Sequence, residues 1–129
     1  MRAEVVGVTF CDEDLGVNRQ DVIASLSGNE KVYLRREPQN RFDKNAVAVM
    51  LKRKDKDFKV GYIRSELAAF LAGFWPKYKF FAKIIEIRAG DVDQGVPYGI
   101  SIDIVHSLRK NMPRKKDQYT ANKEEKIFI

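Results

Sequence analysis

Six short segments with strand-like patterns restrict the folds that this chain can adopt. Alternation of apolar and polar residues with a period of two is typical of a strand that buries one face. The segments are residues 4–10, 31–37, 46–54, 58–63, 77–90 and 100–108. Short polar turns separate the second, third and fourth of them, which predicts an antiparallel meander. In residues 31–37, Val32 and Leu34 fall on the face expected to be buried.

Helical patterns are few. Residues 65–74 place Leu67, Phe70, Leu71 and Phe74 on one apolar face, with Ser65 as the expected N-cap and Pro76 as a block to continuation. Residues 18–28 predict a second, short helix that begins at Asn18 and ends at Gly28. Many short strands and so few helices predict a mainly β fold, a small OB-like β-barrel.

The domain is expected to span residues 1–108. From residue 109 to residue 129 the chain is polar and Lys-rich, so we expect a basic extension whose final residues 127–129 form an edge strand or contact a partner. A length of 129 residues suits one domain. We expect no membrane span and no signal peptide, and a cytoplasmic protein of bacterial or phage origin.

Charge is distributed unevenly along the chain. Residues 30–64 carry eleven basic and five acidic side chains, whereas residues 1–29 carry two basic and five acidic ones. A basic region of this kind is the electrostatic footprint of a nucleic-acid binder, although it is also common on ordinary solvated surfaces. The charge pattern therefore favours nucleic acid without establishing it.

Nothing in the sequence favours catalysis or a cofactor. The single His106 lies in a strand-like segment, and the single Cys11 is expected to be a buried or half-buried small side chain. Asp91 and Asp93 lie in a Gly-containing turn, where carboxylates usually serve the turn itself. One Cys and one His exclude an internal disulfide and a zinc-finger cluster. We expect no enzyme, no metal and no cofactor.

The connection "REPQNRFDKNAVAV" (36–49) is unusually rich in polar residues and places Phe42 between Arg41 and Asp43. A second aromatic residue, Tyr98, lies in the turn "VPYG", and Phe10 ends the first strand-like segment. Such residues often belong to a core. Exposed beside cations, they would suit single-stranded nucleic acid, because bases stack on aromatic rings with about 1–3 kcal/mol each.

These segments together resemble one family. The order "VVGVTF", "VYLRREPQNRFDKNAVAV", "VGYIRSELAAFLA" and "VPYG" is similar to the HIRAN domain, and the similarity runs from residue 4 to about residue 105. The resemblance implies an OB-like barrel that binds the 3′-hydroxyl end of single-stranded DNA. It also implies a partner, a helicase or nuclease module in the same or another chain.

The resemblance assigns roles to individual residues. It implies that Phe42 stacks on a base near the strand end, that Asp43 accepts a hydrogen bond from the 3′-hydroxyl, and that Phe10 and Tyr98 complete the stacking pocket. Five further residues are involved: Asn40 and Lys44 near the terminal nucleotides, Tyr62 toward a phosphate, Arg41 as a replacement for a cation absent at Thr9, and Asn45 as a shaper of the loop.

Asp43 has a second interpretation. A carboxylate attracts a hydroxyl donor and repels a 3′-phosphate, so it would select DNA ends in both ways. Alternatively it forms an Asx turn by accepting from the backbone N–H of Asn45 or Ala46. The two roles are compatible. For the whole chain, the alternative to DNA binding is a protein-interaction domain that kept the barrel; a nuclease has the least support.

Overall fold

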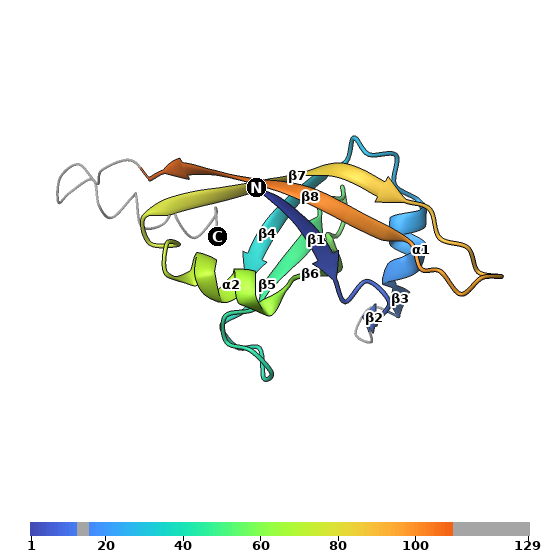
Figure 1. Ribbon diagram of the computed structural model, residues 1–129, viewed down its shortest axis with the longest axis horizontal. Helices are drawn as coiled ribbons and strands as arrows, with labels where there is room; N and C mark the ends of the chain where they lie inside the picture. Colours follow the sequence, from blue (N-terminus) through green and yellow to red (C-terminus); the bar gives the residue numbers. More distant parts are fainter. Residues whose placement is uncertain (13–15, 110–129) are drawn as a thin grey trace.

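The predicted meander is the centre of a closed barrel (Figure 1). The computed structural model describes residues 1–12 and 16–109. The barrel strands are β1 (Arg2–Val6), β4 (Lys31–Arg36), β5 (Val47–Leu51), β6 (Phe58–Ile63), β7 (Tyr78–Arg88) and β8 (Gly99–Leu108). They follow the order β1-β6-β5-β4-β7-β8 around the barrel, and all neighbours are antiparallel. The mainly β barrel predicted from the sequence is confirmed.

Burial follows the predicted alternation in β4 but not in β5. Val32 and Leu34 are buried as expected, yet all five residues of β5 are buried. The outward-facing residues of β5 are covered by long side chains on both neighbouring strands. Ala48 lies between Arg35 and Tyr62, and Met50 lies between two further long residues, Tyr33 and Lys59.

The first strand ends earlier than predicted. Gly7 has a φ of 70°, a left-handed conformation that favours glycine, and it turns the chain out of β1. Residues 7–10 therefore form a turn that leads to a small two-stranded sheet, β2 (Cys11–Asp12) and β3 (Val17–Asn18). Cys11 is exposed, so the expectation that it is buried is wrong.

Both helices begin where the sequence suggests but are shorter. The Asn18 side chain caps α1 (Arg19–Ala24) by accepting a hydrogen bond from the Gln20 N–H at 2.8 Å, as predicted. The helix ends four residues before Gly28. The N-cap of α2 (Ser65–Ala72) is Arg64 rather than Ser65, and its side chain makes no capping bond.

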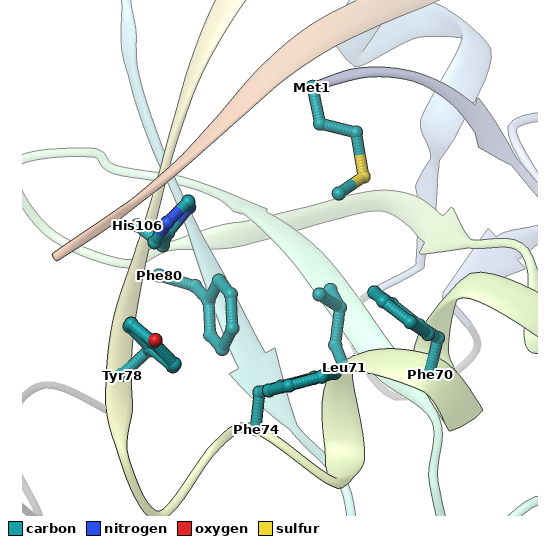
Figure 2. A pocket seen from close by; sticks show the side chains of 7 residues that line it. All are labelled: Met1, Phe70, Leu71, Phe74, Tyr78, Phe80 and His106. Atoms are coloured by element: carbon teal, nitrogen blue, oxygen red, sulfur yellow. The ribbon is translucent and has the colours of Figure 1, made fainter. Parts of the chain in front are cut away.

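The apolar face predicted for α2 is only partly buried. Leu71 is buried, whereas Phe70 is 56% exposed and Phe74 is 42% exposed. The covered side of the helix is completed instead by Ala68 and by Trp75, which follows the helix. Figure 2 shows the exposed rings around a hollow of about 200 Å³, whose lining is Met1, Phe70, Leu71, Phe74, Tyr78, Phe80 and His106.

The β7–β8 hairpin forms the long side of the barrel. In its connecting loop, the Asp91 carboxylate accepts the backbone N–H of Asp93 at 3.0 Å, which is turn chemistry. Within residues 1–12 and 16–109, no three His, Cys, Asp or Glu side chains gather in a way that would hold a metal ion. No helix in this part of the chain is long and apolar enough to cross a membrane. The basic extension predicted beyond Arg109, including residues 127–129, lies outside the described residues.

Gly61 marks the closest approach between β1 and β6. A Cβ added there would meet the backbone oxygen of Val6 and would lie 2.6 Å from Cγ1 of Val5. We expect Gly61→Ala to lower the free energy of unfolding by about 1–3 kcal/mol, because the strands must separate. Urea unfolding monitored by circular dichroism measures this change.

Gly73→Ala is the matched control. A Cβ at Gly73 would meet only the Phe70 oxygen, at the ordinary distance of 3.7 Å, so stability should be nearly unchanged. Equal losses of stability in the two variants would contradict the proposed tight contact at Gly61.

Candidate nucleic-acid interface

A groove of about 640 Å³ lies where the β4–β5 loop, the turn after β1 and the beginning of α2 meet. In Figure 1 the β4–β5 loop and the β2–β3 sheet both project from the lower side of the barrel. The residues lining the groove are Val6, Phe10, Cys11, Arg19, Asn40, Phe42, Asp43, Ala46, Tyr62, Ile63, Arg64, Ser65 and Glu66. Segments far apart in the sequence thus form one surface.

Five of the eight residues predicted to bind DNA line this groove: Phe10, Asn40, Phe42, Asp43 and Tyr62. The Phe42 side chain is 87% exposed and that of Phe10 is 64% exposed, so neither ring belongs to the core. The Arg41 guanidinium lies 5.4 Å from the centroid of the Phe42 ring, close enough for a cation–π contact. Two aromatic faces and a cation are therefore available to a ligand.

Tyr98 and Lys44 do not line the groove. Tyr98 is half-buried against the core, and its backbone is held by Gln20 through hydrogen bonds of 2.6 and 3.0 Å. The same Gln20 side chain donates to the Val8 oxygen at 2.9 Å, which ties Tyr98 to the turn that carries Phe10. Lys44 is exposed on the β4–β5 loop.

Asn40 shapes the β4–β5 loop. Its Oδ1 accepts the backbone N–H groups of Phe42 at 2.9 Å and of Asp43 at 3.1 Å, while its Nδ2 donates to Glu37 at 3.0 Å. The loop-shaping side-chain amide predicted at Asn45 is thus found at Asn40. Because both acceptor positions of Oδ1 are occupied, only the amide nitrogen has a further hydrogen to offer.

The Glu37 carboxylate connects this loop to the barrel. It accepts hydrogen bonds from the Tyr62 hydroxyl at 2.8 Å and from Asn40, and it forms an ion pair with Lys59 at 2.7 Å. Burial alone would raise the pKa of Glu37, but these hydrogen bonds outweigh it and lower the pKa to about 2. Burial alone would lower the pKa of Lys59, but the hydrogen bonds with Glu37 and Tyr62 outweigh it and raise this pKa overall.

This network also restricts what Tyr62 can do. Its hydroxyl donates to Glu37 and accepts from Lys59 at 2.7 Å, so the hydroxyl is engaged within the protein. The ring of Tyr62 remains as part of the groove wall. A phosphate contact through the hydroxyl, as predicted, would require this network to break.

Asp43 forms the Asx turn and also faces the groove. Its Oδ1 accepts the Asn45 N–H at 2.9 Å, and its backbone oxygen accepts the Ala46 N–H at 3.0 Å. No hydrogen bond reaches its other carboxylate oxygen, Oδ2, within the described part of the chain. The side chain therefore stabilises the loop with one oxygen and retains a second oxygen for a ligand.

Sequence reasoning missed Arg19, which lies under the groove. Its side chain is 6% exposed and donates to the Gly7 oxygen at 2.8 Å. Its guanidinium carbon lies 6.0 Å from the Phe10 ring centroid and 5.6 Å from that of Tyr62. An Arg at the first position of a short helix gives no signal of burial, because its partners are distant in the sequence.

The sequence pattern also does not single out the beginning of α2, because Arg64, Ser65 and Glu66, which line the groove, fit the helix that starts there. They directly follow "VGYI" in the sequence, which was the available signal.

A small closed barrel with aromatic and cationic side chains in one groove belongs to the architectural class of OB-like barrels. The chain itself belongs to the HIRAN domain family, whose model matches residues 2–108. It is similar to helicase-like transcription factor of Oryctolagus cuniculus, with 36% identity over 96 residues that cover 74% of this chain. The similar region is 8% of the rabbit protein.

The fold is similar to that in the crystal structure of the HIRAN domain of human HLTF. The TM-score is 0.53 at 18% identity, and the similarity covers 99% of this chain and 87% of the human one. A protein from Lactobacillus plantarum shows a weaker likeness, with a TM-score of 0.48, 19% identity, and 81% of this chain and 92% of that chain covered. HIRAN domains are nucleic-acid-binding modules rather than catalytic ones.

The lowered pKa of Glu37 predicts a pH dependence of stability. Because the carboxylate is more acidic in the folded protein, its contribution is complete above pH 4.5 and is lost as the pH falls toward 2. We expect Glu37→Gln to be less stable than wild type at pH 7, by up to about 3 kcal/mol, and to approach it near pH 2. Chemical unfolding between pH 2 and 7 measures this.

Glu66→Gln, which changes an exposed carboxylate on α2 in the same way, is the control and should change stability much less than Glu37→Gln does. Some acid dependence will persist in every variant, because the pKa values of Glu30, Asp57 and Asp103 are also lowered. A wild-type pH slope in Glu37→Gln would contradict the role assigned to Glu37.

Proposed function

We propose that this chain is a non-catalytic module that binds single-stranded DNA at its 3′-hydroxyl end. The observation that carries the proposal is the arrangement of Phe42 and Asp43. A highly exposed aromatic ring and a carboxylate with one unengaged oxygen stand side by side on a loop whose backbone is held by Asn40. Such an arrangement offers a surface for a base and an acceptor for a hydroxyl at the same place.

Stacking supplies part of the expected affinity. Phe42 and Phe10 present open rings in one groove, and every base has a face that can stack on them. The buried Arg19 supports the groove from beneath, and two exposed cations are available near the rings: Arg41 beside Phe42 and Arg64 at the start of α2. They suit the phosphates of a strand that stacks its last bases on the rings.

Asp43 provides the expected preference for an end. A terminal 3′-hydroxyl would donate to Oδ2, and hydrogen bonds to charged acceptors are stronger than those to neutral ones. A 3′-phosphate, or a continuing strand, would bring negative charge to the same oxygen. The attraction of the hydroxyl and the repulsion of the phosphate therefore both favour a 3′-hydroxyl end.

Such a module would bring another activity to DNA ends. The region of similarity is a small part of the rabbit helicase-like protein, which supports a role beside a helicase or nuclease module in the same or another chain. An assay for DNA binding distinguishes this function from the alternative, a protein-interaction domain that kept the barrel and does not bind DNA.

Phe42→Ala should weaken the binding of a short single-stranded DNA by roughly tenfold or more, since one base loses its stacking partner. Fluorescence anisotropy with a labelled oligonucleotide measures the affinity. Stability should hardly change, because the ring is almost fully exposed. Val92→Ala removes an apolar side chain that is 90% exposed in the β7–β8 loop and should leave affinity unchanged. Equal affinity of Phe42→Ala and wild type would argue against stacking at this residue.

Asp43→Asn tests end selection while keeping an Oδ1 acceptor for the Asn45 N–H. Wild type should bind a 3′-hydroxyl oligonucleotide roughly tenfold or more tightly than the same oligonucleotide with a 3′-phosphate. The difference should shrink in Asp43→Asn, mainly because the phosphate end is no longer repelled. If wild type binds both ends equally, the protein is a general single-strand binder; if it binds neither, the DNA proposal fails.

A further inference from the structure

Three lysines lie side by side on the outer face of the barrel. The strand register places Lys31 of β4 directly opposite Lys83 of β7. On the other side of Lys31, the backbone N–H of Lys52 donates to the Lys31 oxygen at 2.9 Å, so Lys52 is its neighbour at the end of β5. Residues directly opposite in antiparallel strands share a face, so the three side chains form one lysine row.

The middle lysine of this row, Lys31, has a like charge on each side. Like charges directly opposite each other destabilise a sheet. Within residues 1–12 and 16–109, Lys31 and Lys83 form no ion pair, whereas Lys52 forms one with Asp57 at 3.8 Å. Asp103 lies opposite Lys83 in the β7–β8 register, but the hydrogen bond of this carboxylate goes to the amino group of Met1 at 2.9 Å. That bond lowers the pKa of Asp103, and the charge of Lys83 helps to lower it further. Glu30 lines the first hollow beside Lys31, and its carboxylate accepts backbone N–H groups. An anionic ligand would relieve the repulsion.

The surroundings favour a nucleic-acid strand over a small anion. Two hollows, of about 590 and 400 Å³, meet at Lys31. The second is also lined by Tyr33 and by Phe81, which is 44% exposed. Lysines that hold phosphates beside rings that accept bases are the usual elements of a single-strand path.

The lysine row lies on the same outer face as the groove. Lys31 and Arg35 are four residues apart on β4. Arg35 pairs with Ala48 of β5, Ala48 pairs with Tyr62 of β6, and Tyr62 lines the groove. Four residues of strand span roughly 14 Å. We propose that the lysine row holds phosphates of the same DNA strand whose 3′ end occupies the groove. This inference rests on the proposed function.

The test compares two oligonucleotides that both end in a 3′-hydroxyl, one of three nucleotides and one of ten. Barrels of this class bind about 4–16 nucleotides, so only the longer one should reach the lysine row. Lys31→Gln/Lys83→Gln should bind the ten-nucleotide strand several-fold more weakly at 0.15 M salt and the three-nucleotide strand as wild type does. Because this variant neutralises two fewer phosphates, the slope of log affinity against log salt should become shallower by about 1.4.

Lys54→Gln/Lys56→Gln is the control, because it removes the same charge from exposed residues in the β5–β6 turn. It should bind both oligonucleotides nearly as wild type does. The melting temperature of the row variant should stay close to that of wild type, because both lysines are exposed. Weaker DNA binding then cannot be attributed to unfolding, whereas a clearly lower melting temperature would indicate a structural role for these lysines.

Unchanged binding of the ten-nucleotide strand by the row variant would overturn the inference, even if wild type binds both strands. Equal weakening in the row variant and the control would also overturn it, because only net charge would then matter. If wild type binds neither oligonucleotide, the proposed function itself fails.

Discussion

The hydrogen-bonded carboxylate of Glu37 is the interaction on which the candidate site depends. It follows the end of β4 and joins the β4–β5 loop, through Asn40, to β6, through Tyr62 and Lys59. Asn40 in turn holds the backbone of Phe42 and Asp43. A half-buried carboxylate with four side-chain partners, the fourth being Arg35 at 3.2 Å, keeps its charge at neutral pH. The loop is therefore held by charge-assisted bonds rather than by apolar packing.

This arrangement explains how an exposed loop can present a large aromatic ring in a defined place. Phe42 contributes almost nothing to the core, and its position follows from the hydrogen bonds of its neighbours. On the opposite wall, Arg19 fixes the turn after β1 through the Gly7 oxygen. The two walls meet at Tyr62, whose hydroxyl bonds to Glu37 and whose ring centroid lies 5.6 Å from the Arg19 guanidinium. Binding would require little rearrangement of either wall, which limits the entropic cost of association.

Local patterns predicted much of the fold, and contacts between distant segments account for the errors. The alternation of Val32 and Leu34, the Asn18 cap and the meander depend on neighbouring residues and were confirmed. Met50 is buried and Phe70 is exposed because of the side chains that neighbouring strands and helices do or do not pack against them. The periodicity of the sequence does not reveal these contacts. At the site, the family motif pointed to Phe42 and Asp43, whereas the loop-holding role of the Asn40 side chain and the position of Arg19 required the three-dimensional structure.

The most direct test of the account is the position of bound DNA on the barrel. A titration of the ¹⁵N-labelled protein with a ten-nucleotide strand ending in a 3′-hydroxyl, followed by ¹H–¹⁵N NMR spectra, reports on each backbone N–H. We expect the largest shifts at Phe42 and Asp43, with further shifts in the turn after β1 and at the beginning of α2. Shifts concentrated instead around the hollow of Phe70, Phe74 and His106, or no shifts at all, would contradict this expectation.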